Sequence, residues 1–265
     1  MKKKIIVTAI ALIIVIIAVF SIAPQHTSQK SETLTSGTLT IGLEGTYAPF
    51  SYRQNGKLTG FEVELSTKIA KKLGLKPKYV QTKWDSLIAG LGAKRYDVVF
   101  NNVGITPERQ KNYRFSSPYI YAKTVLIKPS TATDSTDLRT LADIKGKKMA
   151  QSTTSNFGAL AKKSGAEIVA VPGITEAMNM VTTGRADGTL NDMGAYQVWK
   201  KANPSAKTAA IDLSKESPAV PAGALIKKSN KALQGKINQA LADLRADGTL
   251  KSLSIKYFNT DLTVK

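Results

Sequence analysis

The chain of 265 residues lacks cysteine altogether and contains a single histidine, His26. Without cysteine it can form neither a disulfide framework nor a cysteine-based zinc site. The one histidine lies in a polar stretch outside any predicted domain, so neither a histidine-rich metal site nor a Ser-His-Asp triad can be built. These absences exclude several classes of enzyme, and we expect the protein to use no metal and no cofactor.

Acidic residues are scarce as well, because 19 Asp and Glu stand against 38 Lys and Arg, and the formal net charge is +19. Such a charge is typical of proteins that bind nucleic acid, and equally of soluble proteins that work beside an anionic membrane or cell wall. The lysines favour a solvated surface, since they occur as scattered pairs on predicted helix faces or turns without interleaved aromatics. We therefore expect no nucleic-acid partner.

The N-terminal segment joins three lysines at positions 2–4 to an apolar stretch over residues 5–23. The positive end should stay in the cytoplasm. The stretch is long for the core of a signal peptide and just long enough to span a bilayer. Ser21-Ile22-Ala23 has the form of a cleavage site, but Pro24 would follow the cut. The segment is therefore open to two interpretations.

We predict that residues 1–23 form either a signal peptide or, as we favour, an uncleaved membrane anchor. Residues 24–36 are rich in Ser, Thr, Gln and Lys and should form a flexible tether. In both cases the rest of the chain is expected outside the cytoplasmic membrane, either secreted or attached to its outer face through the N-terminal segment.

The remainder of the chain alternates short apolar strands with amphipathic helices, which predicts an α/β fold. Two α/β blocks are expected, at about 37–121 and 123–216, and the C-terminal segment could join either. The predicted strands are 39–42, 78–80, 98–100, 124–127, 148–150, 168–171, 188–190 and 224–226. The predicted helices are 66–73, 84–91, 154–163, 175–182, a long one around 233–244, and 250–257.

Residues 101–109 are the most informative segment. They follow an apolar run, 96–100, that reads as a buried strand, and they offer small polar residues and a glycine before a helix start at Thr106-Pro107. Arg109 lies just inside that helix. Loose backbone amides at a strand end together with one guanidinium predict a receptor for a small carboxylate.

Several phrases taken together resemble the family 3 extracellular solute-binding proteins of polar amino-acid ABC transporters. The similarity runs from about residue 37 to residue 258, and the order and spacing of the phrases carry it. They are EGTYAPF at 44–50, GFEVEL at 60–65, WDSLIAGL at 84–91, NNVGITPER at 101–109, FSSPY at 115–119, GRAD at 184–187 and LRADGT at 244–249.

The resemblance implies a two-lobe periplasmic-binding-protein-like fold of type II, with the ligand in the cleft between the lobes and two hinge crossovers. Lobe 1 would comprise residues 37–121 plus 217–265, and lobe 2 residues 122–216. The lobes of such proteins close around the ligand by a hinge motion. The implied partners are an amino acid and the permease subunits of an ABC importer, and we expect a monomer.

The resemblance also assigns the groups that would hold the α-amino and α-carboxylate groups of the ligand. Arg109 would clamp the carboxylate, since a planar guanidinium suits two oxygens, and Asp192 would receive the ammonium. Thr154 matches a residue that also holds the carboxylate, and it reads equally as a helix N-cap. Asn102 and Gly104 match loop positions whose backbone faces the ligand, although Gly104 departs from the usual Ser or Thr.

Three further residues would surround the ligand side chain. Trp84 and Tyr47 match aromatic walls, and an aromatic face covers apolar or cationic groups well. Glu44 matches a position that contacts the polar tip of the ligand. The competing interpretations are a core aromatic for Trp84 and a solvated carboxylate for Glu44, whereas Phe50 is equally a core or a wall residue.

The composite of residues 102–109 with Glu44 and Trp84 looks most like the cystine-binding branch. Cystine is a long zwitterion, so that Glu44 could meet its distal ammonium group. A basic amino acid would also suit Glu44, and glutamine stays open. A cyclohexadienyl dehydratase-like enzyme would need a general acid or base, for which Glu44 is the one candidate, and we expect the protein not to be an enzyme.

Overall fold

The computed structural model describes residues 32–130 and 138–265. The predicted leader or anchor of residues 1–23 and most of the predicted tether of residues 24–36 lie outside this part of the chain. In the described ranges, no helix is both long and apolar enough to cross a membrane.

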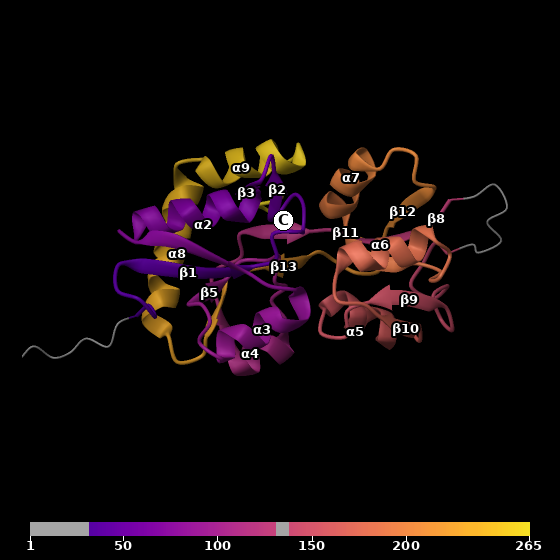
Figure 1. Ribbon diagram of the computed structural model, residues 1–265, viewed down its shortest axis with the longest axis horizontal. Coiled ribbons are helices and arrows are strands. Elements are labelled where there is room, and N and C mark those ends of the chain that lie inside the picture. Colours follow the sequence, from indigo (N-terminus) through magenta and orange to yellow (C-terminus); the bar gives the residue numbers. More distant parts are fainter. Residues whose placement is uncertain (1–31, 131–137) are drawn as a thin grey trace, which may run out of the picture. The chain divides into compact units, whose positions relative to one another are not determined.

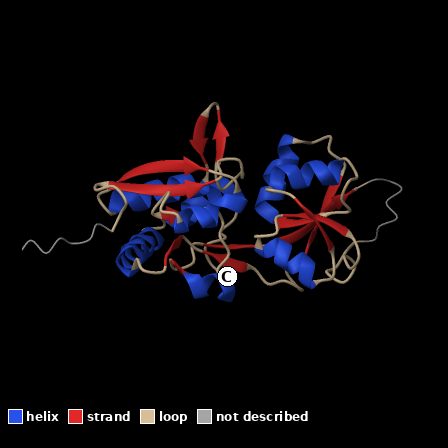
Figure 2. Ribbon diagram, turned by 60° about the horizontal axis from the view of Figure 1, so that its bottom comes forward, coloured by secondary structure: helices blue, strands red, loops and turns tan. Residues whose placement is uncertain are grey.

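Strands and helices alternate along the described chain, as predicted (Figures 1 and 2). The strands are β1 (Thr38–Leu43), β2 (Tyr52–Gln54), β3 (Lys57–Thr59), β4 (Lys76–Gln81), β5 (Val98–Val99), β6 (Tyr113–Phe115), β7 (Ile120–Ala122), β8 (Thr124–Pro129), β9 (Lys148–Gln151), β10 (Glu167–Ala170), β11 (Thr189–Asp192), β12 (Thr208–Asp212), β13 (Val220–Ala222) and β14 (Leu225–Lys227). The helices are α2 (Phe61–Lys72), α3 (Trp84–Gly92), α4 (Pro107–Asn112), α5 (Asn156–Lys163), α6 (Ile174–Thr182), α7 (Met193–Ala202), α8 (Lys231–Ala246) and α9 (Thr249–Phe258).

The first lobe is built on a five-stranded sheet of order β4-β1-β5-β14-β6. Strand β1 runs parallel to β4 and β5, whereas β14 runs antiparallel to β5 and β6. Because β14 belongs to the C-terminal segment, that segment returns to the first sheet. The residue limits that we give for the two lobes stay predictions.

Alternation along the strands buries both faces of this sheet. Val98 and Ile226 belong to a core cluster with residues of α2, α8 and α9, while their neighbours Val99 and Leu225 belong to another with residues of α3. Successive side chains of a strand point to opposite faces. A sheet covered on both faces needs continuous apolar runs, which explains why these strands read as such runs in the sequence.

The second lobe contains an antiparallel sheet of order β11-β8-β12 and a parallel pair, β10-β9. A single parallel bridge between Met149 and Gly188 connects β9 to the segment that leads into β11. Helices α5, α6 and α7 supply apolar residues to the clusters on this lobe. The strand ends at Gln151 and Asp192 therefore come close to one another on the same lobe.

Two crossover strands connect the lobes, as the resemblance implies. Strand β7 leads from the first sheet to β8, and β13 leads back from β12 to β14. The two strands pair antiparallel, with Ile120 opposite Ala222 and Ala122 opposite Val220. A pair of short strands of this kind is a place where a hinge motion can be taken up.

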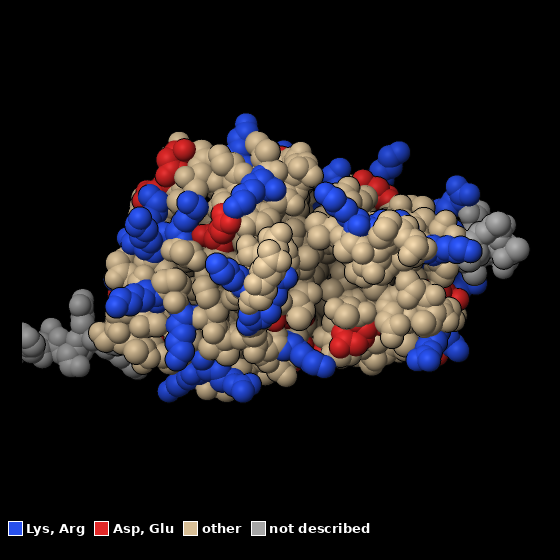
Figure 3. Space-filling view, turned by 45° about the horizontal axis from the view of Figure 1, so that its top comes forward, with Lys and Arg blue, Asp and Glu red and all other residues tan. Residues whose placement is uncertain are grey.

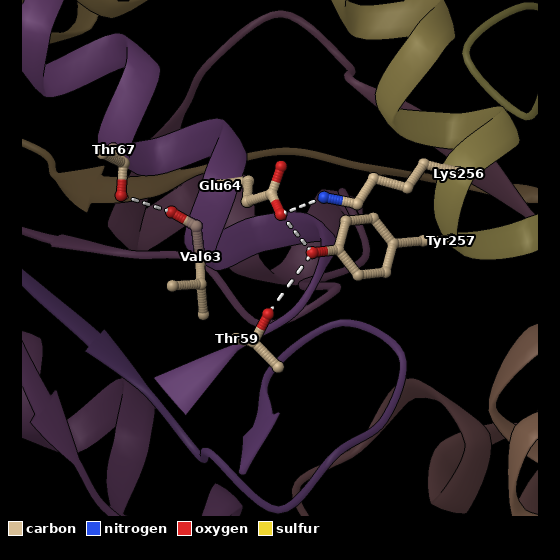
Figure 4. A network of polar contacts seen from close by, with 6 residues as sticks. All are labelled: Thr59, Val63, Glu64, Thr67, Lys256 and Tyr257. Atoms are coloured by element: carbon tan, nitrogen blue, oxygen red, sulfur yellow. Dashed lines mark hydrogen bonds and ion pairs between the residues drawn. The ribbon is translucent and has the colours of Figure 1, made fainter. Parts of the chain in front are cut away.

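Helix α2 is fastened to α9 by a polar cluster (Figure 4). Lys256 Nζ and the Tyr257 hydroxyl both donate to Glu64 Oε1, each at 2.5 Å, and the Tyr257 hydroxyl lies 3.4 Å from the Thr59 hydroxyl. Partial burial opposes ionisation of Glu64, but the two donors outweigh it, and the pKa of Glu64 is lowered. The cluster joins the C-terminal helix to the N-terminal part of the same lobe.

The start of α2 differs from the prediction, which placed this helix at 66–73. The helix begins at Phe61, directly after Gly60, whose φ of 128° is a conformation that side-chain-bearing residues rarely adopt. A Cβ on Gly60 would also lie 2.3 Å from the carbonyl oxygen of Phe50. Gly60 therefore lets the chain turn tightly into the helix, which places Glu62 in its first turn.

Candidate functional site

A cavity with about 520 Å³ of empty volume, partly open to solvent, lies between residues of the two lobes. Of the predicted site residues, Glu44, Tyr47, Trp84 and Asn102 line it, whereas the other four do not. Its further lining residues are Asn101, Ala150, Gln151, Ser152, Ser155, Asn156, Phe157, Gly173, Ile174, Ala177, Thr189 and Asn191.

Arg109 lies beside this cavity and contacts both lobes. Thr106 caps the helix that carries it, accepting from the Arg109 N–H at 3.3 Å, and Pro107 occupies the first turn as predicted. The guanidinium donates to the carbonyl oxygens of Gly104 at 2.9 Å and Thr154 at 3.2 Å. Burial lowers the pKa of Arg109 to about 10, so it stays a cation at neutral pH.

The Trp84 ring completes this corner of the site. The Arg109 guanidinium carbon lies 5.4 Å from the ring centroid, within the range of a cation–π contact. Trp84 is only 8% exposed, and its Nε1 is buried without a hydrogen-bond partner among the described residues. A buried indole N–H usually finds an acceptor, and none of the described residues supplies one to Trp84.

Packing at the hinge accounts for the glycine at position 104. Gly104 pairs with Ala222 in an isolated antiparallel bridge, and a Cβ on it would lie 3.0 Å from Val220 Cγ1 and 3.4 Å from Asn156 Oδ1. The usual Ser or Thr would therefore require the Val220 side chain to shift by a few tenths of an ångström. The carbonyl of Gly104 orients Arg109, which is a role that needs no side chain.

The backbone N–H of Asn102 is directed away from the cavity. Asn102 has a φ of 46°, and its N–H donates to Glu62 Oε1 at 2.6 Å. Asn102 lines the cavity, and its side chain is the part of the residue that can bind a molecule there. The Tyr119 hydroxyl donates to the same oxygen of Glu62 in a very short hydrogen bond. Glu62 thus holds the ligand-facing loop from behind.

Glu62 itself is a residue that the sequence reasoning missed. It is fully buried, and its Oε2 has no hydrogen-bond partner in the part of the chain that the structure describes. Burial, opposed by the Tyr119 and Asn102 donors, raises the pKa of Glu62 to about 7. Its signal in the sequence is an acidic residue on the same helical face as Ser66 and Ile69, which are buried as well.

Asp192 lies at the end of β11 and caps α7. Its Oδ1 accepts from the Ala195 N–H at 3.0 Å, while Oδ2 is buried and has no partner among the described residues. Burial, opposed by the N–H groups of Ala195 and Gly194, raises the pKa of Asp192 to about 7. A buried carboxylate oxygen without a donor is costly, and an ammonium group would satisfy it. The adjacent Asn191 lines the cavity.

Tyr47 and Asn191 both line the cavity and contact each other. The Tyr47 hydroxyl donates to Asn191 Oδ1 at 3.0 Å, and the Tyr47 ring stacks on Phe50 with 4.9 Å between the centroids. Phe50 is fully buried and also packs against Phe258, at 5.2 Å. Tyr47 therefore forms the wall, and Phe50 belongs to the core behind it.

Glu44 is held by Asn101, which the sequence reasoning set aside. Asn101 Nδ2 donates to Glu44 Oε2 at 2.6 Å, and its Oδ1 accepts from the Glu44 N–H at 2.9 Å. Burial raises the pKa of Glu44 to about 7, against the lowering effect of Asn101. Glu44 is thus not a freely solvated carboxylate, because one of its oxygens is fixed and the residue lines the cavity.

Thr154 is not a helix N-cap, so that part of its interpretation was wrong. Ser155 caps α5, since its Oγ accepts from the Gly158 N–H at 2.8 Å. The Thr154 hydroxyl donates instead to Asp85 Oδ1 at 3.0 Å, and the Ser152 hydroxyl donates to the same oxygen at 2.5 Å. Asp85, which was not predicted, therefore connects the start of α3 to the loop before α5.

The charge of the cavity is opposite to that of the surface. Figure 3 shows Lys and Arg side chains spread over one face with few acidic ones among them. No lysine or arginine is among the described residues that line the cavity, whereas Glu44 is. In the described ranges, no group of three or more His, Asp or Glu residues could hold a metal ion. The Glu44 carboxyl in the cavity wall suits a positive group, and the Arg109 guanidinium beside the cavity suits a negative one.

The sequence and the fold were compared with known proteins. The model of the bacterial extracellular solute-binding proteins, family 3, matches residues 39–260. The probable amino-acid ABC transporter-binding protein of Haemophilus influenzae is 40% identical over 265 residues, which cover 99% of this chain and 100% of that protein.

Two cystine-binding proteins are similar as well. The L-cystine-binding protein TcyA of Bacillus subtilis is 40% identical over 229 residues, which cover 86% of this chain and 83% of that protein. The solved structure of the L-cystine solute receptor of Neisseria gonorrhoeae, in the unliganded open conformation, is 42% identical. It matches with a TM-score of 0.57 and covers 86% of this chain and 96% of the other.

Proposed function

Because the chain belongs to the bacterial extracellular solute-binding proteins, family 3, we propose that it captures an L-amino acid and delivers it to the permease of an ABC importer. The observation that carries this proposal is the buried, unpaired Oδ2 of Asp192, the residue that follows Asn191 in the cavity wall. Arg109 lies beside the same cavity, because its guanidinium contacts the ring of Trp84, which lines it. A carboxylate for the α-ammonium and a guanidinium for the α-carboxylate together suit a zwitterion.

Cystine is the ligand that we propose first. Two similar proteins are named for cystine binding. The cavity supports this choice, since Tyr47 and Trp84 supply aromatic walls and Glu44 a carboxylate away from the α-groups. A basic amino acid is the alternative that Glu44 would also serve, and glutamine is the next.

We propose binding and not catalysis for Glu44. Its pKa of about 7 would also suit a general acid or base, which is the one observation in favour of a dehydratase-like activity. The hydrogen bond from Asn101 fixes one oxygen of Glu44 and suits a binding role. Turnover of prephenate or arogenate by the purified protein would reverse this assignment.

The N-terminal segment and the surface complete the proposal. The described part is proposed to work as a monomer outside the cytoplasmic membrane, with residues 1–23 as a leader or an anchor. The dispersed basic residues would keep it soluble beside an anionic surface. We propose no role in nucleic-acid binding.

A melting screen against the twenty L-amino acids and cystine tests the proposed function. A ligand that binds only the folded protein at a hundred times its Kd stabilises it by about 2.7 kcal/mol, so we expect a clear rise in Tm with at least one of them. Arg109→Ala should remove this rise, since the loss of a bidentate charged contact costs about 3 kcal/mol, or about a hundredfold in affinity.

The matched control for this experiment is Arg185→Ala, because Arg185 is exposed and lies outside the cavity. This variant should respond to the ligand as the wild type does. If no amino acid raises the Tm of the wild type, the proposed function is wrong. If Arg109→Ala binds normally, the assignment of the α-carboxylate is wrong while the function stands.

A further inference from the structure

A second hollow adjoins the ligand cavity on the side of Glu44. It encloses about 910 Å³ of empty volume, partly open to solvent, and shares Glu44, Gly173 and Ile174 with the cavity. The shared residues show that the two spaces meet at this point. The second hollow is further lined by Thr46, Gln81, Thr82, Lys83, Pro172, Thr175 and Glu176.

Gly173 lies in the wall that the two spaces share, between two carboxylates. A Cβ on Gly173 would lie 3.4 Å from Glu44 Oε1 and 3.6 Å from Glu176 Oε2, so the two carboxylates flank the same point. The φ of Gly173 is −177°, an extended conformation that any residue can adopt. Both distances are ordinary van der Waals contacts, so a methyl group would fit here, whereas a larger side chain would crowd the two carboxylates.

Charges of both signs face the second hollow. Glu44 and Glu176 supply two carboxylates, and Lys83 Nζ lies 3.8 Å from Glu176 Oε1. The Lys83 side chain is 74% exposed, and an ion pair this exposed contributes little to stability. The charged groups of a ligand could therefore replace this ion pair at small cost.

The N-terminus of α6 adds donors to the same wall. No side chain caps this helix at Gly173, and Gly173 to Glu176 line the hollow. Free N–H groups at a helix start favour a carboxylate. An independent observation on the adjoining cavity also indicates a ligand, since the buried Nε1 of Trp84 has no partner among the described residues.

We propose that this second hollow is the subsite for the distal amino-acid head of a long diamino-dicarboxylate, of which cystine is the example. The distal ammonium binds between Glu44 and Glu176. The distal carboxylate binds Lys83 and the start of α6. The inference rests on the proposed function, because the proximal head must bind at Arg109 and Asp192. It distinguishes a ligand with two zwitterionic heads from lysine or arginine, which lack the distal carboxylate.

Three disulfides test this assignment by calorimetric titration. They are cystine, the mixed disulfide of cysteine with cysteamine, which lacks the distal carboxylate, and the mixed disulfide of cysteine with 3-mercaptopropionate, which lacks the distal ammonium. All three keep the proximal head. The wild type should bind cystine about tenfold or more tightly than either mixed disulfide, since each lacks one charged contact.

Two variants separate the two contacts. Lys83→Gln should weaken cystine binding severalfold and leave the binding of the cysteamine disulfide unchanged. Glu176→Gln should weaken the binding of both ligands that carry the distal ammonium. It should leave the binding of the mercaptopropionate disulfide unchanged. Lys71→Gln, at an exposed lysine outside both spaces, is the matched control and should bind all three as the wild type does.

Gly173→Val supplies a steric test that does not depend on charge. Because Gly173 lines both spaces, a branched side chain here should weaken the binding of cystine much more than that of a short ligand such as S-methylcysteine. If the wild type binds no amino acid or disulfide, the proposed function fails. If it binds cystine and neither Lys83→Gln nor Glu176→Gln changes the ranking of the three disulfides, the distal subsite alone is wrong.

Discussion

Three buried carboxylates define the site at the scale of single residues. Burial raises the pKa of Glu44, Glu62 and Asp192 to about 7 in each case. Glu44 lines the cavity, Glu62 accepts from the backbone of the lining residue Asn102, and Asp192 follows the lining residue Asn191. Groups with shifted pKa values and a cavity in common are typical of functional sites. These carboxyl groups, more than the overall charge of the chain, indicate which kind of ligand binds.

The first prediction concerns the pH dependence of stability without ligand. The folded-state pKa of about 7 for Asp192 lies above its ordinary value of 3.8. Its protonation therefore stabilises the fold fully below about pH 4, and this contribution is lost as the pH rises to about 7. Thermal unfolding from pH 5 to 8 should show a falling Tm, and Asp192→Asn should flatten that fall.

Ligand binding should show the opposite trend. The ligand ammonium group needs the ionised form of Asp192, so the apparent affinity should increase by up to about tenfold per pH unit between pH 5 and 7. Titrations at pH 5, 6, 7 and 8 measure this. Asp243→Asn, at a partly exposed residue on α8, is the control and should keep the wild-type profile. An affinity that does not vary with pH would contradict the role of Asp192.

At the scale of elements, the loop before α5 and the start of α3 form the contact that spans the site. Asp85 accepts from the hydroxyls of Ser152 and Thr154, and the Thr154 carbonyl accepts from Arg109. Both contacts connect the first lobe to the second. They hold the loop against α3 beside the cavity, so they should favour the arrangement of the lobes that encloses a ligand.

The second prediction follows from this contact. Asp85→Ala should weaken ligand binding by about threefold to tenfold, since hydrogen bonds to a charged group contribute about 1.5–3 kcal/mol and those at a partly exposed site less. The Tm without ligand should change little. Affinity by calorimetry and Tm by calorimetric melting check the two parts. Ser86→Ala, at the next exposed position of α3, is the matched control.

Four amphipathic helices were predicted close to their observed ranges, whereas helix α7 and a short hairpin were missed. The patterns of α3, α6, α8 and α9 lie close to their predicted ranges. The hairpin of β2 and β3 was missed, although Asn55 and Gly56, with φ values of 51° and 75°, are a known signal for a two-residue turn. The three-residue strands that it joins are too short to show alternation.

At the scale of the whole molecule, two short strands carry the connection between the sheets. Strands β7 and β13 pair over three residues each, and Gly104 bridges to Ala222 at the edge of this pair. Val220, on the same strand, is the residue that a side chain at position 104 would meet. The loop that carries Gly104 is therefore in direct contact with the crossover strands, and we expect ligand binding at this loop to be coupled to hinge motion.

The third prediction concerns this motion. Because ligand contacts from both lobes are made only when the lobes approach, a bound amino acid should shift the population towards the closed form. Small-angle X-ray scattering of the wild type should show a smaller radius of gyration with a saturating ligand than without. Arg109→Ala should show no decrease, while Arg185→Ala should respond as the wild type does. An unchanged radius in the wild type would contradict a hinge closure.

The sequence by itself determined the class of fold and the family, and it predicted the pair of groups that would suit a zwitterion. Apolar periods and the ordered phrases are local signals, and Arg109 and Asp192 stand at the ends of elements that such signals locate. The tertiary structure decided the partners of these groups. Asn101 on Glu44, Glu62 behind Asn102, and Asp85 on the loop at 152–154 are contacts between residues at least 40 positions apart. Burial and long-range contacts of this kind leave little trace in a local pattern, because they depend on how separate elements pack.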